Sequence, residues 1–169
     1  MTAYVALLRA VNVAGTGKLP MAELRGVAEG LGLANVRTYI ASGNLLFESS
    51  LSEPEVKAAL ETRLEAYAGK YVLIFVRTAA EMAAVRAADP FPDAHGSRHM
   101  VYFLDAAPPQ DTQQSARNQA GERIALGLRE IYVDYGDGIR FTKLKLAATK
   151  IATMRNMNTV AKLVAMASS

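Results

Sequence analysis

The sequence predicts an α+β fold of two ferredoxin-like (split βαβ) lobes, of which the second is incomplete and ends in helices. Strand-length apolar runs alternate with stretches in which apolar residues recur every three or four positions. The order of these elements is βαββαβ over residues 3–77, and the second half repeats βαββα with its final strand missing or replaced by helix. We therefore expect a lobe over residues 1–77, a helix and connecting loop over 78–98, and a second lobe with C-terminal helices over 99–169.

The first lobe is predicted to contain four strands, over residues 3–8, 36–40, 45–48 and 71–76. Two amphipathic helices separate them, one opened by Pro20 and one by a capping box of Ser52 and Glu55. The first strand is almost entirely apolar, which favours a central place in the sheet. Right-handed crossovers place the first and second strands parallel, with the third antiparallel between them.

The second lobe is predicted to contain strands over residues 99–104, 122–126 and 130–135. Before it, Thr78 and Glu81 form a capping box for a short helix that ends before Asp89. Its own helices should cover residues 108–121, a segment capped by Thr142, and a final segment with Val160 and Leu163 on its apolar face.

The composition excludes several classes of protein. The chain has no cysteine, so a disulfide framework, a thiol nucleophile and a thiolate metal site are excluded. Its apolar runs are too short to cross a bilayer, and Arg9 interrupts the first of them before it reaches the length of a secretory signal. We therefore predict a cytoplasmic protein with no membrane partner and no cofactor, as a monomer or weak dimer.

The charge is unevenly distributed. The formal net charge is +3, and no Asp or Glu follows Asp137, whereas six basic residues do: Arg140, Lys143, Lys145, Lys150, Arg155 and Lys162. Such a basic segment favours anionic partners, for example nucleic acid, nucleotides or phosphorylated metabolites. A solvated helix face that balances acidic residues elsewhere is the alternative interpretation.

Polar residues follow two strands that should end at the same edge of the first sheet. The set comprises Arg9, Asn12, Gly15 and Lys18 after the first strand, and Ser42, Gly43 and Asn44 after the second. A cation, two amides and exposed glycine N–H groups can together bind an anion. Turn geometry alone would explain the glycines and Asn12, but it does not explain a cation at the end of an apolar strand.

Three residues of the second half could complete this site: Lys143, Arg155 and Asn156. Asn156 or Asn158 would cap the last helix, so Arg155 would lie beside the positive end of a helix. Capping alone also explains these asparagines. The glycines near Lys18 do not have the spacing of a P-loop or of a dinucleotide-binding loop, and His95 and His99 have no acidic partner at a metal-binding spacing.

The residues described above also carry a resemblance to the bacterial domain-of-unknown-function family 1697. It spans nearly the whole chain and rests on residues 6–9, 12–13, 15, 18, 21–25, 36–39, 42–44, 47, 89–91, 138–139, 142–144, 155–156 and 158–160. The resemblance implies an α+β fold of two ferredoxin-like lobes and no particular activity. The chain departs from the family pattern at Ala14, where a glycine is usual, and at Met157, where tryptophan is usual.

These observations lead to three functional hypotheses. The first is a protein that binds a phosphate-bearing nucleotide or nucleic acid at the edge around Arg9. The second is a phosphoryl or nucleotidyl hydrolase or transferase at the same edge, for which Glu23 and Glu48 are the nearest acids to hold a metal. The third is an interaction module that recognises another protein through an exposed strand edge.

Overall fold

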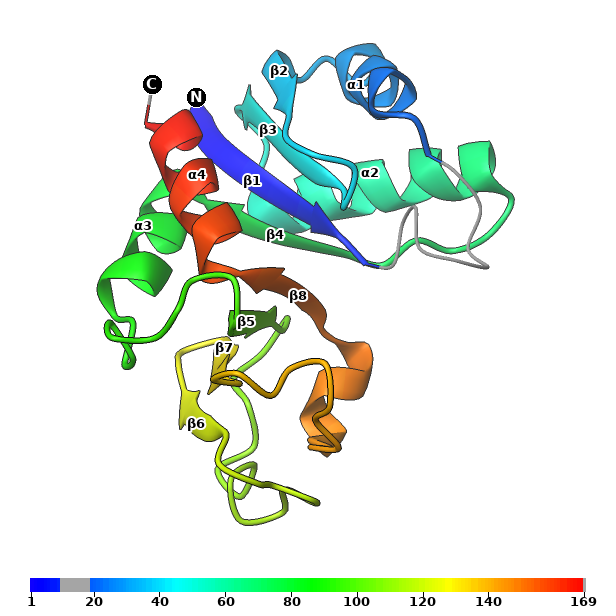
Figure 1. Cartoon of the computed structure of the whole chain (residues 1–169). Coiled ribbons are helices and arrows are strands. Elements are labelled where there is room, and N and C mark those ends of the chain that lie inside the picture. The colour runs from blue at the N-terminus through cyan, green and yellow to red at the C-terminus, as the bar shows by residue number, and fades with distance from the viewer. Residues whose placement is uncertain (10–18, 169) are drawn as a thin grey trace. The chain divides into compact units, whose positions relative to one another are not determined.

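The computed structural model describes residues 1–9 and 19–168. The chain forms two compact units, which are Met1–Met82 with Leu163–Ser169 (the first unit) and Ala83–Lys162 (the second unit). Each unit is built on one four-stranded antiparallel sheet (Figure 1). The predicted α+β fold with two ferredoxin-like lobes is thereby confirmed.

The first sheet has the strand order that the sequence predicted. Its strands are β1 (Thr2–Leu8), β2 (Ala34–Thr38), β3 (Asn44–Ser49) and β4 (Ile74–Thr78), and they lie in the order β2-β3-β1-β4. Since β3 is antiparallel to both β1 and β2, β1 and β2 run parallel to each other, and their C-terminal ends lie at the same edge of the sheet. β1 is central, and its residues from Tyr4 to Leu8 are all buried, as its continuous apolar sequence requires.

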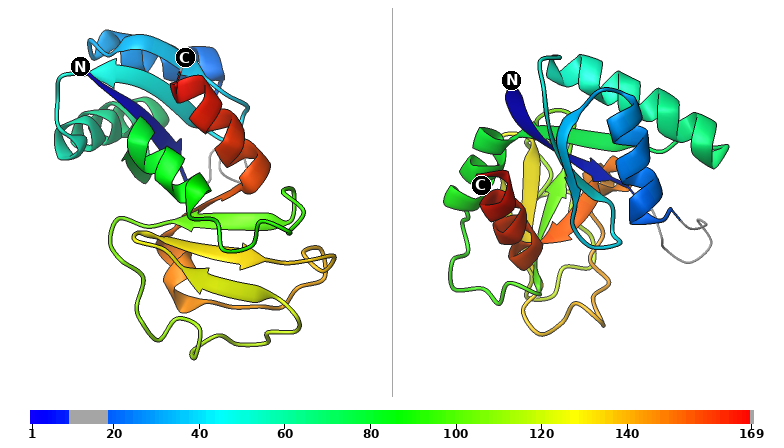
Figure 2. Two further views of the ribbon diagram at one scale, coloured as in Figure 1. Left: turned by 90° about the vertical axis from the view of Figure 1, so that its left-hand side faces the viewer. Right: turned by 90° about the horizontal axis from the view of Figure 1, so that it is seen from above.

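Two helices cover one face of this sheet, α1 (Met21–Gly30) and α2 (Glu53–Ala68), as the views of Figure 2 show. Tyr4, Ala6 and Leu8 alternate along β1 and pack in one core with Leu24 of α1 and Leu60 of α2. The helix α2 begins at the predicted capping box, in which the Ser52 hydroxyl accepts from the Glu55 N–H. The Glu55 carboxylate in turn accepts from the Ser52 N–H.

The second sheet repeats the strand order of the first. Its strands are β5 (His99–Phe103), β6 (Arg123–Leu126), β7 (Glu130–Asp134) and β8 (Thr153–Asn156), in the order β6-β7-β5-β8. The prediction that the fourth strand is missing was wrong. β8 is short and carries Arg155 and Asn156, so it lacks the apolar run by which a central strand is recognised, yet it pairs with β5 over four residues, Val101 opposite Arg155 among them.

The second unit is incomplete in its crossover helices instead. The helix predicted over residues 108–121 is a succession of turns and bends. Side chains there bond to nearby backbone in ways that compete with a helix: Thr112 donates to the Pro109 carbonyl, and Ser115 donates to the Thr112 carbonyl. The helix predicted after Thr142 is reduced to a 3₁₀ segment, η1 (Ala147–Ile151).

Two α-helices complete the chain. α3 (Ala79–Ala87) begins at the predicted capping box, where Thr78 and Glu81 exchange side-chain-to-backbone hydrogen bonds of 2.8 and 3.1 Å. α4 (Met157–Ala167) begins in the second unit and ends in the first. Its C-terminal turn is held within the first unit by Arg37, which donates to the Met166 carbonyl. No helix of the described residues is both long enough and apolar enough to span a bilayer.

Replacing Leu60 by alanine should destabilise the first unit, because Leu60 is fully buried in its core. We expect the free energy of unfolding to fall by about 2–5 kcal/mol, measured by urea denaturation. Thr62→Ala on the exposed side of the same helix is the control and should change it by less than about 0.5 kcal/mol. Equal effects of the two variants would contradict the packing of α2 described here.

Candidate functional site

Backbone hydrogen bonds bring three segments together at the C-terminal end of β1. The Leu8 N–H donates to the Gly43 carbonyl and the Arg9 N–H donates to the Leu73 carbonyl, both over 2.9 Å. The end of β1, the β2–β3 turn and the segment entering β4 therefore meet at one edge of the first sheet. The Arg9 side chain is exposed there.

The β2–β3 turn uses its polar residues to hold its own conformation. Asn44 is fully buried, and its amide donates to the Tyr39 carbonyl at 2.8 Å and to the Ser42 hydroxyl at 2.9 Å. Gly43 has a φ of 90°, a conformation in which any side chain would be strained. Asn44 is thus a positioning residue, whereas Ser42 is only half-buried.

Three predicted residues of the loop after β1, Asn12, Gly15 and Lys18, lie outside the described residues. So does Ala14, one of the two departures from the family pattern. The two acids considered as metal ligands lie on α1 and β3: Glu23 is exposed and Glu48 is half-buried. Within residues 1–9 and 19–168, no group of three or more His, Asp or Glu side chains is arranged to hold a metal ion.

The predicted residues of the second unit have different surroundings. Lys143 is exposed in an irregular segment. Asn156 caps α4 by accepting from the Thr159 N–H at 2.9 Å, as one of the two predicted capping residues. Arg155 is buried, and desolvation lowers its pKa to about 10. Its guanidinium donates to the Thr153 hydroxyl at 2.8 Å and to the Met154 carbonyl at 2.9 Å.

Met157, the second departure from the family pattern, is also buried, and its N–H donates to the Gly96 carbonyl. At this position the side chain packs in the interior rather than offering a stacking surface.

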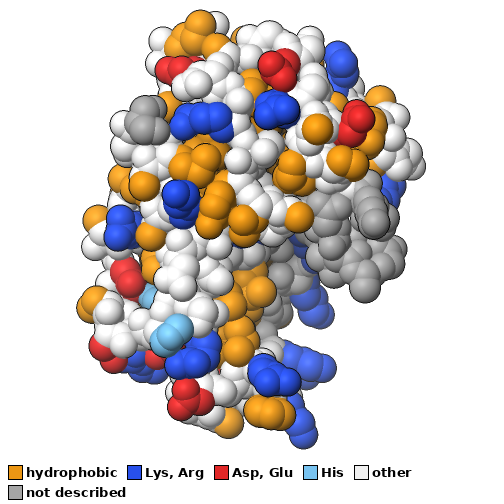
Figure 3. Space-filling view, turned by 45° about the horizontal axis from the view of Figure 1, so that its top comes forward, with side chains coloured by type: hydrophobic (Ala, Val, Ile, Leu, Met, Phe, Trp, Pro, Cys, Tyr) orange, Lys and Arg blue, Asp and Glu red, His pale blue; other side chains and the backbone are white. Residues whose placement is uncertain are grey.

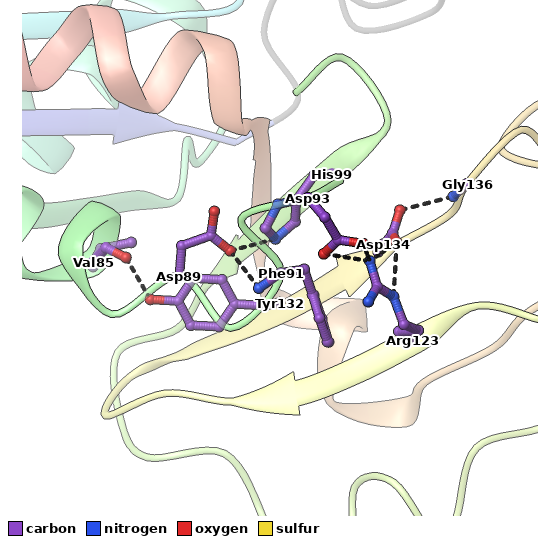
Figure 4. Close-up of polar contacts among 9 residues, drawn as sticks. All are labelled: Val85, Asp89, Phe91, Asp93, His99, Arg123, Tyr132, Asp134 and Gly136. Carbon is purple, nitrogen blue, oxygen red and sulfur yellow. Dashed lines mark hydrogen bonds and ion pairs between the residues drawn. The ribbon is translucent and has the colours of Figure 1, made fainter. Parts of the chain in front are cut away.

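A cluster that the sequence did not predict surrounds His99 at the start of β5 (Figure 4). The imidazole is 1% exposed, and its ring lies 5.6 Å from that of Phe91 and 6.1 Å from that of Tyr132. Its Nε2 lies 3.4 Å from Asp89 Oδ1 without forming a hydrogen bond. The same Oδ1 accepts from the Phe91 N–H at 2.9 Å.

Arg123 of β6 belongs to the same cluster and contacts Phe91. Its guanidinium lies over the Phe91 ring, 4.6 Å from the centroid, and donates to Asp134 and to Asp93. The Asp-Pro-Phe sequence at 89–91 was the available signal, since an acid and an aromatic residue border a loop there. The sequence alone did not predict that Asp89 and Phe91 contact His99 of β5, or that Phe91 contacts Arg123 of β6.

The chain thus has two ferredoxin-like units: the first carries an exposed arginine, Arg9, at a sheet edge, and the second buries the imidazole of His99 and the guanidinium of Arg155. The chain belongs to the family DUF1697, described as a protein of unknown function, whose profile matches residues 1–132. Among solved structures, the chain is similar to the conserved bacterial protein SP0830 from Streptococcus pneumoniae. The two share 25% sequence identity over 98% of each chain, with a TM-score of 0.80. No curated protein matches the chain.

Replacing Asn44 by alanine should lower stability even in the absence of any ligand. The change removes two hydrogen bonds made by a fully buried side chain and leaves the Tyr39 carbonyl without this donor, so we expect a loss of about 1–3 kcal/mol in urea denaturation. Ser42→Ala removes only one of the two bonds and should cost less. If Asn44→Ala unfolds like the wild type, the turn is not held in the way described.

The buried imidazole should make the stability of the second unit depend on pH. Burial lowers the pKa of His99 below its usual 6.5, although the nearby Asp89 raises it in part. The folded state therefore favours neutral His99, while the unfolded chain takes up a proton as the pH falls through about 6.5. The stabilisation is present above that pH and is lost progressively below it, towards the pKa of the folded state.

Denaturant unfolding of wild type and of His99→Gln between pH 7 and pH 5 tests this dependence. We expect the wild type to lose stability more steeply than His99→Gln. His95→Gln, a change at an exposed histidine in the same segment, should keep the wild-type slope. A slope that His99→Gln leaves unchanged would mean that other groups cause the dependence.

Proposed function

We propose that the protein binds a phosphate-bearing ligand, a nucleotide or nucleic acid, at the edge formed by the loop after β1 and the β2–β3 turn. The observation that carries the proposal is the location of Arg9. Five consecutive buried residues precede it, and two backbone hydrogen bonds fix the point where the chain leaves the sheet, so an exposed cation stands at a rigid edge. Rigid anchoring reduces the conformational entropy lost on binding.

The chemistry of the edge suits phosphate. An arginine guanidinium can donate two parallel hydrogen bonds to phosphate oxygens. The Ser42 hydroxyl on the adjacent turn can supply a further donor, and Asn44 and Gly43 hold that turn in one conformation. The sequence adds Asn12, Gly15 and Lys18 to the same loop.

The charge of the whole chain supports an anionic ligand. The formal net charge is +3, and all acidic residues precede position 138. A positive potential raises the rate at which anions encounter the protein, and this contribution weakens as salt is added.

Isothermal titration calorimetry at low salt would test the proposal with inorganic phosphate, mononucleotides and a short single-stranded RNA as probes. Arg9→Ala should weaken binding by roughly tenfold or more, the effect of losing a charge-assisted hydrogen bond. Arg9→Lys should retain part of the affinity because it keeps the charge.

Arg25→Ala is the matched control, since Arg25 is an exposed arginine of the same unit that pairs with Glu29 on α1. It removes the same formal charge and should leave the affinity close to that of the wild type. Absence of binding by all probes, or equal losses in Arg9→Ala and Arg25→Ala, would refute a site at this edge.

A further inference from the structure

The second unit contains a cavity of about 580 Å³ that shares no lining residue with the edge around Arg9. Every residue that lines it belongs to Ala83–Lys162, so the cavity lies within one compact unit. Its walls come from β5, from the end of β7, and from the two irregular crossover segments. Its volume falls within the range of about 300–1,000 Å³ that small-molecule sites occupy.

Two of the residues that line this cavity, Arg117 and Lys145, carry neighbouring positive side chains. Arg117 and Lys145 exchange two backbone hydrogen bonds, of 3.0 and 2.9 Å, as an isolated antiparallel bridge. Residues directly opposite each other in such a pair carry their side chains on the same side. The bridge therefore holds two positive side chains as neighbours although they are 28 positions apart in the sequence.

Like charges at directly opposed positions are destabilising. Both side chains are exposed, and among the described residues neither Arg117 nor Lys145 makes an ion pair that would offset this repulsion. Lys150 of η1 adds a third positive side chain to the lining. Lys and Arg side chains also project together at the lower right of Figure 3, with few acidic side chains among them.

Two tyrosines supply a neutral donor to the same cavity. The hydroxyls of Tyr102 and Tyr135 lie 2.6 Å apart, and both residues line the cavity. Burial raises the pKa of both phenols, so each keeps its proton at neutral pH. One of the two protons forms the bond between them, which leaves the other able to donate to a third group.

The remaining lining is partly apolar. Leu144 and Leu146 contribute to it together with the two tyrosine rings, and Ser115 and Thr149 contribute hydroxyls. Cations, a neutral O–H donor and an apolar wall within one cavity match a molecule that has both an anionic group and a compact apolar or aromatic body.

We propose that this cavity is a second binding site, which takes an organic phosphate about as large as a mononucleotide. Arg117 and Lys145 bind the phosphate, and Tyr102 and Tyr135 contact the organic part. The site is independent of the edge at Arg9, because it uses different residues in a different unit.

Titration of ¹⁵N-labelled protein with AMP, and separately with inorganic phosphate, tests the proposal by NMR and calorimetry. AMP should shift the amide resonances of residues around 117 and 145, and Arg117→Ala and Lys145→Gln should each weaken AMP binding there by roughly tenfold. Tyr102→Phe should weaken AMP binding more than phosphate binding, since it breaks the hydroxyl pair next to the organic part.

Two control variants distinguish this cavity from general electrostatic attraction and from the edge at Arg9. Arg140→Ala removes an exposed cation of the same segment that does not line the cavity, and it should leave the affinity unchanged. Arg9→Ala should abolish only binding at the edge around Arg9, so the shifts around residues 117 and 145 should persist. Circular dichroism and thermal unfolding of each variant confirm that it remains folded.

Three results would overturn the proposal. AMP that shifts no resonance around residues 117 and 145 would exclude the site. Equal losses in Arg140→Ala and Arg117→Ala would reduce the binding to general electrostatic attraction. A short RNA that shifts these resonances when AMP does not would assign the cavity to a nucleic-acid surface instead.

Discussion

The pairing of β1 with β3 on one side and β4 on the other constrains the rest of the first unit. Because β1 is buried from Tyr4 onwards, its register fixes which side chains face the α1 and α2 core. It also fixes where the chain leaves the sheet. The bonds from Leu8 to Gly43 and from Arg9 to Leu73 follow directly from that register. The location of Arg9 is therefore a consequence of strand pairing rather than of the loop that follows.

The second unit reaches the same strand order without α-helices in its crossovers. The strand pairing is retained although one crossover segment is irregular and the other contains only the 3₁₀ segment η1. An amphipathic helix would fill the face of the sheet with packed side chains. In the second unit the two irregular segments meet at the bridge between Arg117 and Lys145, and both line the cavity beside Tyr102 and Tyr135.

Several polar residues that the sequence suggested as ligand-binding residues have structural roles. Asn44 holds a turn, Asn156 caps α4, and Arg155 is buried in β8. These residues lie in segments that also carry the family resemblance, and the structure gives a physical reason for their presence that requires no ligand. Burial and hydrogen bonding thus distinguish the residues that hold the backbone in place from those that remain exposed at the sheet edge, such as Arg9.

Local signals in the sequence predicted the sheet of the first unit and its helices α1 and α2, because apolar periodicity, the capping boxes at Ser52 and Thr78 and the Ser42-Gly43-Asn44 turn agree with one another. The sequence also indicated that the end of β1 and this turn share an edge. Three features could be seen only in the folded chain: residues 108–121 are irregular, Thr153–Asn156 is a strand, and Arg117 lies opposite Lys145. These features depend on residues that are distant in the chain, so a local pattern cannot predict them. A polar strand such as β8 is stable only because β5 lies beside it, and no local pattern records that neighbour.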